Sequence, residues 1–167
     1  MAIDHPQRVG ALSLGCTTLG KAQGVPRPAE VDDVIRGSDQ DTLIGLLVSP
    51  EWLSTHPEML EMWETRKENP IPIYAQRLHY QASENHDAWD ALSAIKAPTL
   101  VIHGSEDQFM MTANATLLAE RIPQAAIYLV EGGRHLFFRE FQAEASRMVL
   151  DFLAKHPLGQ TRYAPSS

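Results

Sequence analysis

Two short apolar segments, each ended by glycine, constrain the fold of this chain more than any other feature. Residues 97–104 are rich in β-branched side chains, and residues 126–131 are followed by two glycines. Both patterns predict β-strands, the first of them covered on both faces. Between them, residues 112–121 have apolar side chains at helical spacing, with Thr112 in the position of an N-cap. A strand, a helix and a strand in this order predict parallel pairing.

The rest of the chain extends this pattern in both directions. Residues 9–15 form a further apolar run, so we expect about three parallel strands, roughly at 9–15, 98–103 and 126–131. Between the first two strands, in residues 29–95, interrupted helical spacing and four prolines predict several short helices. Residues 137–153 predict a final helix. The predicted fold class is therefore α/β, with helices flanking the sheet and a helical insertion after its first strand.

The order of these segments divides the chain into four parts. We expect the first core strand and an N-terminal turn in residues 1–20, and a helical cap or lid insertion in residues 21–95. Residues 96–156 are expected to form the C-terminal core with two polar loops, and residues 157–167 a frayed tail.

Composition and charge argue against several classes of function. The 167 residues include 14 Lys and Arg against 21 Asp and Glu, which gives a net charge of −7 and a pI near 5.4. An acidic chain without a basic run is a poor candidate for binding nucleic acid or an anionic membrane surface. No segment approaches the ~20 apolar residues of a membrane span, and no signal-peptide pattern follows Met1. With a single cysteine, Cys16, the expected protein is soluble, cytoplasmic and free of intrachain disulfides.

Polar clusters follow two of the predicted strands at their C-terminal ends. One contains Ser105, Glu106 and Asp107, and the other ends at His135. Because parallel strands end at a common sheet edge and lie ~4.8 Å apart, a carboxylate and His135 can meet there. A carboxylate that accepts from imidazole Nδ1–H leaves the other ring nitrogen as a general base. Spacing leaves both Glu106 and Asp107 open as the carboxylate, and the structural alternative is a solvated histidine beside an Asx-turn.

Several segments, in this order, resemble the C-terminal part of an α/β-hydrolase, in its esterase and enol-lactonase-like branch. They are Ala97–Asp107, Leu118–Ala125, Gly132–Phe138 and Val149–Leu153, preceded by His5–Val9, Ala11–Leu14, Ser49–Leu53 and a cap-like stretch from Gln81 to Ile95. The resemblance implies that the acid is Asp107 and the catalytic histidine His135, with Arg134 where the family usually has glycine. The implied reaction is hydrolysis of a small carboxylic ester or lactone.

The nucleophile motif of that family, Gly-x-Ser-x-Gly, does not occur in this sequence. We therefore expect a C-terminal half that lacks the nucleophile and the second oxyanion-hole donor, and that is inactive alone. Cys16 is an alternative nucleophile, although its position is more typical of a small loop hydrophobe. Ser105 is interpreted as a turn residue. The histidines lack metal-ligand spacing and there is no glycine-rich phosphate loop, so neither a metal nor a cofactor is expected.

Apolar side chains suggest where a substrate would bind. Trp52, Met59, Tyr74 and Phe137 are candidates for a pocket lining, the alternative being simple core packing. Two other functions stay open. One is a non-catalytic ligand-binding or interaction module, in which the exposed edge of the first strand pairs with a second copy or with a missing N-terminal segment. The other is a dehalogenase or C–C bond hydrolase of the same family.

Overall fold

The computed structural model describes residues 1–37, 40–68 and 70–157. Beyond its first residue, the predicted tail at 157–167 lies outside the described residues. Within them, no helix has the length and apolar character needed to cross a bilayer.

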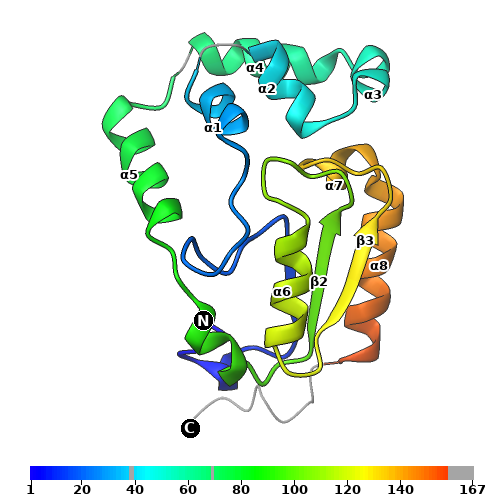
Figure 1. The fold of residues 1–167 in the computed structure, drawn as a ribbon. Coiled ribbons are helices and arrows are strands. Elements are labelled where there is room, and N and C mark those ends of the chain that lie inside the picture. Colours follow the sequence, from blue (N-terminus) through cyan, green and yellow to red (C-terminus); the bar gives the residue numbers. More distant parts are fainter. Residues whose placement is uncertain (38–39, 69, 158–167) are drawn as a thin grey trace, which may run out of the picture.

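Three parallel strands form one sheet in the order β1–β2–β3 (Figure 1). They are β1 (Leu12–Gly15), β2 (Thr99–Gly104) and β3 (Ala126–Val130). Val101 is aligned with Leu14 on one side and with Ile127 on the other. The predicted fold class and the three predicted strands are therefore confirmed, with small shifts at the strand ends.

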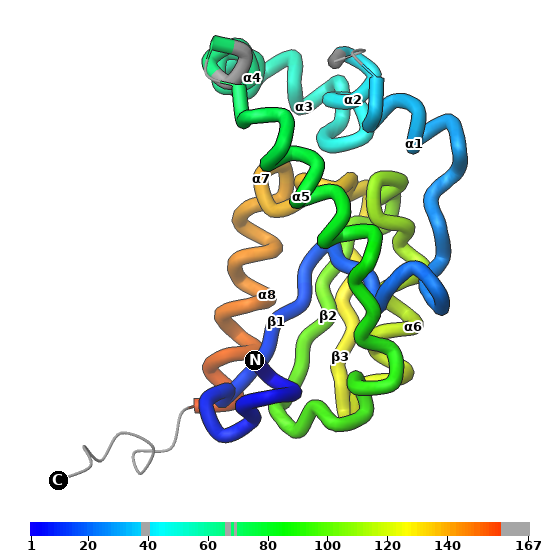
Figure 2. Tube along the Cα trace, turned by 90° about the vertical axis from the view of Figure 1, so that its left-hand side faces the viewer, coloured from blue at the N-terminus to red at the C-terminus, as the bar shows by residue number. Residues whose placement is uncertain are grey.

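The central strand β2 is buried along its whole length because helices cover both faces of the sheet. Val101 packs in one cluster with residues of α6 (Ala113–Arg121) and η2 (Trp89–Ala94). Leu100 and Ile102 point to the other face, toward α8 (Gln142–Lys155). Figure 2 shows α6 and α8 on opposite sides of the strands. Each fully buried aliphatic side chain stabilises this arrangement by ~1.5–3 kcal/mol.

The predicted C-terminal helix is interrupted, and Thr112 stands at the predicted N-cap position of α6 without making a side-chain capping bond. A short α7 (Phe137–Glu140) precedes α8, and Phe141 between them has φ −110° and ψ 39°. The ring of Phe141 packs against the core cluster around Phe137, which favours the break over a continuous helix. Thr112 has helical dihedral angles and makes no capping bond; its hydroxyl instead donates to the carbonyl of Gly104 at 2.7 Å.

A short 3-10 turn η1 (Pro6–Arg8) precedes β1, and five α-helices lie between β1 and η2 in the residues that the structure describes. They are α1 (Ala29–Arg36), α2 (Gln40–Leu47), α3 (Pro50–Thr55), α4 (Glu58–Glu68) and α5 (Ile73–Glu84). Proline is the first residue of α3, where the hydroxyl of Ser49 accepts from the Trp52 N–H at 3.1 Å. Figures 1 and 2 place α1 to α4 beyond the carboxyl ends of the strands. This helical insertion therefore lies over the sheet edge at which the polar loops begin.

Candidate active site

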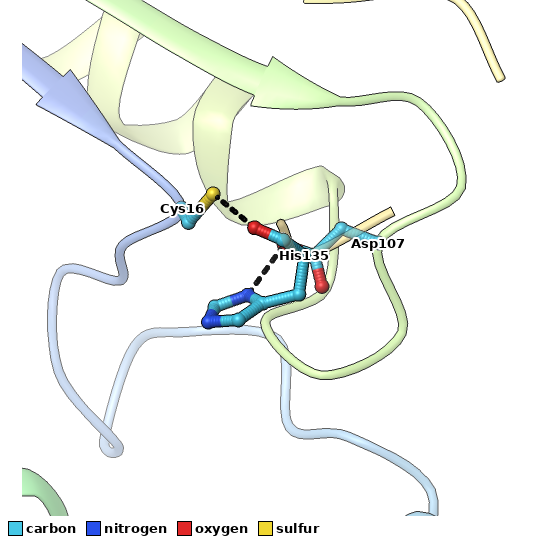
Figure 3. A group of neighbouring side chains, drawn as sticks. All are labelled: Cys16, Asp107 and His135. Carbon is cyan, nitrogen blue, oxygen red and sulfur yellow. Dashed lines mark hydrogen bonds and ion pairs between the residues drawn. The ribbon is translucent and has the colours of Figure 1, made fainter. Parts of the chain in front are cut away.

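The loops after β2 and β3 bring Asp107 and His135 into contact. Nδ1 of His135 lies 2.9 Å from Oδ2 of Asp107 (Figure 3). The two loops are also joined by their backbones, since the N–H of Glu106 donates to the carbonyl of Gly133 at 2.9 Å. This close approach requires Gly104, where a Cβ atom would lie 2.2 Å from the Gly133 oxygen. The contact predicted from the strand order is therefore present, while the catalytic roles of the two residues stay predictions.

The Asp107 carboxylate is 2% exposed, and hydrogen-bond donors reach both of its oxygens. Oδ1 accepts from the Met110 N–H at 2.8 Å, and Oδ2 lies 3.0 Å from Nε2 of His103 as well as near His135. Burial raises the pKa of the Asp107 carboxyl, but hydrogen bonds from His103, His135 and Met110 and the nearby His135 charge outweigh it. The net effect is a pKa below the ordinary value. Asp107 is therefore held as a carboxylate that faces His135.

His135 keeps one ring nitrogen available on the open side of this pair. Its side chain is 18% exposed, and Figure 3 shows Nε2 pointing away from Asp107. The Phe109 ring stacks against the imidazole, with 4.4 Å between ring centroids, and the Arg27 guanidinium lies 5.5 Å from the Phe109 centroid. A neutral imidazole with the proton on Nδ1 can accept a proton at Nε2. The geometry therefore suits general-base chemistry.

The structure decides between the two neighbouring acidic residues. The Glu106 side chain is 58% exposed and lies 4.0 Å from Arg134. Asp107 is the carboxylate that contacts His135. The Ser105 hydroxyl accepts from the Gly132 N–H at 2.8 Å and so joins the two loops as a turn residue.

Cys16, directly after β1, is the third group at this sheet edge. It adopts φ +47°, a left-handed conformation that is uncommon for a residue with a side chain. Its Sγ donates to the backbone carbonyl of His135 at 2.8 Å, as Figure 3 shows. Burial, together with the Asp107 charge, raises the pKa of the thiol to about 12. Cys16 is thus a neutral thiol at pH 7, which argues against the alternative of a cysteine nucleophile.

Ligand atoms of Cys16, Asp107 and His135 all lie within 4.8 Å of one another, a grouping that could hold a metal ion. Sequence spacing did not reveal it, because the three residues come from three separate loops. Metal binding there would require loss of the Cys16 proton and of the bond between Nδ1 and Asp107. The arrangement therefore favours proton transfer over metal coordination.

The loop that carries His135 is bound to the helical insertion on both sides of the histidine. Nη1 of Arg134 donates to the carbonyls of Gly45 and Val48, and the Leu136 N–H donates to the Leu47 carbonyl at 2.8 Å. These acceptors lie at the C-terminal end of α2, where carbonyls lack partners within the helix. Arg134, where the resemblance leads us to expect glycine, therefore links the insertion to the histidine loop. Sequence reasoning missed this role because nothing in the local pattern places α2 beside the loop.

A second contact between the helical insertion and the core joins Ser49 to Glu140, the last residue of α7. Both carboxylate oxygens of Glu140 accept from Ser49, one from its hydroxyl and one from its N–H at 3.0 Å. Ser49 is also the N-cap of α3, so the start of that helix is fixed to α7. The insertion and the core are thus joined by side-chain as well as backbone hydrogen bonds.

The predicted substrate-pocket residues do not come together. Phe137 is buried and lines an apolar hollow of about 410 Å³, which is also bounded by Gly15, Ile102 and the half-exposed Phe138 and by none of the other three candidates. Trp52 stacks on His56 at 4.0 Å between centroids, and Met59 is buried within α4. Tyr74 is 67% exposed on α5. These four side chains therefore do not share one hollow, because their helices direct them to different surroundings, and their contact with a substrate stays a prediction.

The sheet, its flanking helices and the paired loops define the class of this protein: it has a partial α/β-hydrolase fold. Residues 2–142 match the model of the family described as serine aminopeptidase, S33, and the chain belongs to that family.

Curated proteins and solved structures give similar results. A 2-hydroxy-6-oxononadienedioate/2-hydroxy-6-oxononatrienedioate hydrolase of Burkholderia vietnamiensis is 31% identical over 166 aligned residues, covering 92% of this chain. The enol-lactonase of Burkholderia xenovorans superimposes with a TM-score of 0.70 at 24% identity, covering 92% of this chain and 59% of its own. Est816, described as an N-acyl homoserine lactone degrading enzyme, gives a TM-score of 0.68 at 28% identity, over 89% of this chain and 60% of its own. The chain spans 57% of the length of the Burkholderia vietnamiensis relative.

Proposed function

We propose that this chain supplies the acid and the histidine of a serine-hydrolase triad that cleaves small carboxylic esters or lactones. The observation that carries the proposal is the 2.9 Å contact between Asp107 Oδ2 and His135 Nδ1, with Nε2 pointing away from Asp107 (Figure 3). The hydrolase relatives support the reaction class, and the lactone-degrading enzyme at 28% identity supports the substrate class.

In the proposed reaction, His135 Nε2 removes the proton from an attacking serine hydroxyl and later delivers it to the leaving group. Asp107 keeps the other ring proton on Nδ1 and stabilises the imidazolium that forms. The Asp107 carboxylate is suited to this role because it is buried and has hydrogen-bond contacts at both oxygens, so that it stays charged while its orientation is fixed.

The serine is proposed to come from a polypeptide segment outside this sequence. No Gly-x-Ser-x-Gly motif is present, and the chain spans 57% of its relative's length. Among the described residues, β1 pairs on one side only, with β2. The apolar hollow between Gly15 and α8 lies beside this strand and has half-exposed Phe138 and exposed Leu150 on its rim. An open strand edge next to an apolar surface suits the addition of further strands and a helix.

The proposal is tested by coexpressing this chain with the part of the Burkholderia vietnamiensis relative that precedes the region aligned with this chain. We expect the assembled protein to hydrolyse p-nitrophenyl esters and small lactones, and the chain alone to show negligible turnover. His135→Ala in the assembled protein should abolish hydrolysis, whereas exposed His79→Ala on α5 should leave it unchanged. Enzymatic turnover by the chain alone that is lost in Cys16→Ala would contradict the proposal and indicate a cysteine enzyme.

A C–C bond hydrolase is the second candidate, and the names of its relatives favour it. Five matched curated proteins, at 27% to 31% identity, are named as hydrolases of 2-hydroxy-6-oxononadienedioate and 2-hydroxy-6-oxononatrienedioate. Comparing kcat/KM for 2-hydroxy-6-oxononadienedioate with kcat/KM for a lactone, in the same assembled protein, distinguishes the two reactions. Ligand binding without turnover of either substrate would instead favour a binding module.

A further inference from the structure

We propose that His103 is a positioning residue that fixes the Asp107 carboxylate toward His135, a role that rests on the proposed function of that pair. His103 is the fifth residue of β2 and is fully buried. It lies within a buried and mostly apolar strand, where an imidazole costs free energy unless its polar atoms are paired. Its position therefore calls for a specific partner.

The ring nitrogen Nε2 of His103 faces two acceptors. It lies 2.8 Å from the Met110 carbonyl oxygen and 3.0 Å from Asp107 Oδ2. Because neither oxygen can donate, Nε2 must carry the proton. His103 Nδ1 has no hydrogen-bond partner in the described part of the chain, which fits an unprotonated nitrogen of a neutral ring.

His103 and Asp107 both contact the backbone of Met110. Met110 donates its N–H to Asp107 Oδ1 at 2.8 Å and offers its carbonyl to His103. The carboxylate is therefore held at both oxygens, and rotation about its Cβ–Cγ bond would break at least one bond to a buried donor. Oδ2, the oxygen shared by His103, is the one that faces His135.

This arrangement determines which nitrogen of His135 carries the proton. A carboxylate oxygen fixed 2.9 Å from Nδ1 favours the Nδ1–H tautomer, and that tautomer leaves Nε2 free as a base. His103 thus acts on His135 through Asp107, without contact with substrate.

The test is long-range ¹H–¹⁵N NMR of the imidazole rings in the ¹⁵N-labelled 167-residue chain at a pH where they are neutral. In the wild type we expect His103 to be the Nε2–H tautomer and His135 the Nδ1–H tautomer. In His103→Met, which keeps an apolar side chain in the strand, His135 should lose its Nδ1–H preference. His103→Gln, whose amide can donate to the same two oxygens, should restore it, and exposed His79→Gln should change nothing.

The outcomes separate this proposal from the proposed function. A wild-type His103 protonated at Nδ1 overturns the positioning role, even if His103→Met fails to fold. So does a folded His103→Met variant in which His135 keeps the Nδ1–H tautomer. Absence of ester or lactone hydrolysis in the assembled protein, with the tautomers as expected, refutes the proposed function and leaves the geometric role of His103 intact.

Discussion

Replacing Asp107 by Asn tests how much the charged carboxylate contributes to stability and to the site. Asn has nearly the same shape but carries no charge, and one of its two terminal atoms is a donor. The native carboxylate meets three donors, from Met110, His103 and His135, inside a site where it is 2% exposed. The Asn side chain leaves at least one of these donors without an acceptor.

The magnitude follows from the cost of an unpaired buried group. Leaving one buried donor unsatisfied costs ~1–3 kcal/mol, so Asp107→Asn should lower the free energy of unfolding by about that amount at pH 7. In the assembled protein, Asp107→Asn should also reduce kcat by roughly 10⁴-fold, the effect of the same substitution in a Ser-His-Asp triad.

The stability difference should depend on pH in one direction. The pKa of the Asp107 carboxyl is below its ordinary value, so the charged form stabilises the folded state above the unfolded pKa of ~3.9. That contribution is lost as the pH falls through the lower, folded pKa. Urea unfolding of both proteins at pH 7 and at several values below 4 should show the gap narrowing in acid. A gap that is absent at pH 7, or equally large throughout, would refute this reasoning.

Three further substitutions test neighbouring contacts. The Cys16 thiol of the wild-type protein has a pKa of about 12, so it should react with iodoacetamide at pH 8 far more slowly than a free cysteine, as measured by mass spectrometry. Cys16→Ala should lower the free energy of unfolding in urea by about 1 kcal/mol, because the bond to the His135 carbonyl is lost. Gly104→Ala should lower the free energy of unfolding by ~1–3 kcal/mol or more, measured by thermal unfolding, because the alanine Cβ would lie 2.2 Å from the Gly133 oxygen. Arg134→Gln should speed amide hydrogen exchange in α2 without altering exchange in β2, since it removes the guanidinium that donates to the end of α2. If α2 exchanges at the same rate in the variant as in the wild type, the link between insertion and core is contradicted.

Much of the fold could be predicted because local sequence patterns encode local structure. Short apolar runs and glycine placement gave the three strands to within a few residues, and helical spacing gave α6. Parallel topology then required the loops after β2 and β3 to meet, which is why an acidic residue of the first loop and His135 could be paired from their positions alone. The choice between Glu106 and Asp107 came from family resemblance, and the structure agrees with Asp107.

The features that were missed depend on contacts between residues far apart in the chain. Phe141 interrupts the last helix because its ring packs against the sheet cluster, and Thr112 bonds to Gly104 across the loop. The separation of the four candidate pocket residues was missed as well, because the orientation of each helix, which sets where a side chain points, follows from tertiary packing.

Sequence alone therefore determined the three strands of this chain, the helix between the last two of them and the sheet edge at which its polar residues gather, because these follow from local patterns and strand direction. Only the tertiary structure decided that His103 meets Asp107, that Cys16 is a buried neutral thiol and that Arg134 binds the end of α2. Hydrogen bonds and burial depend on distances between segments, and those distances are fixed only when the elements pack together.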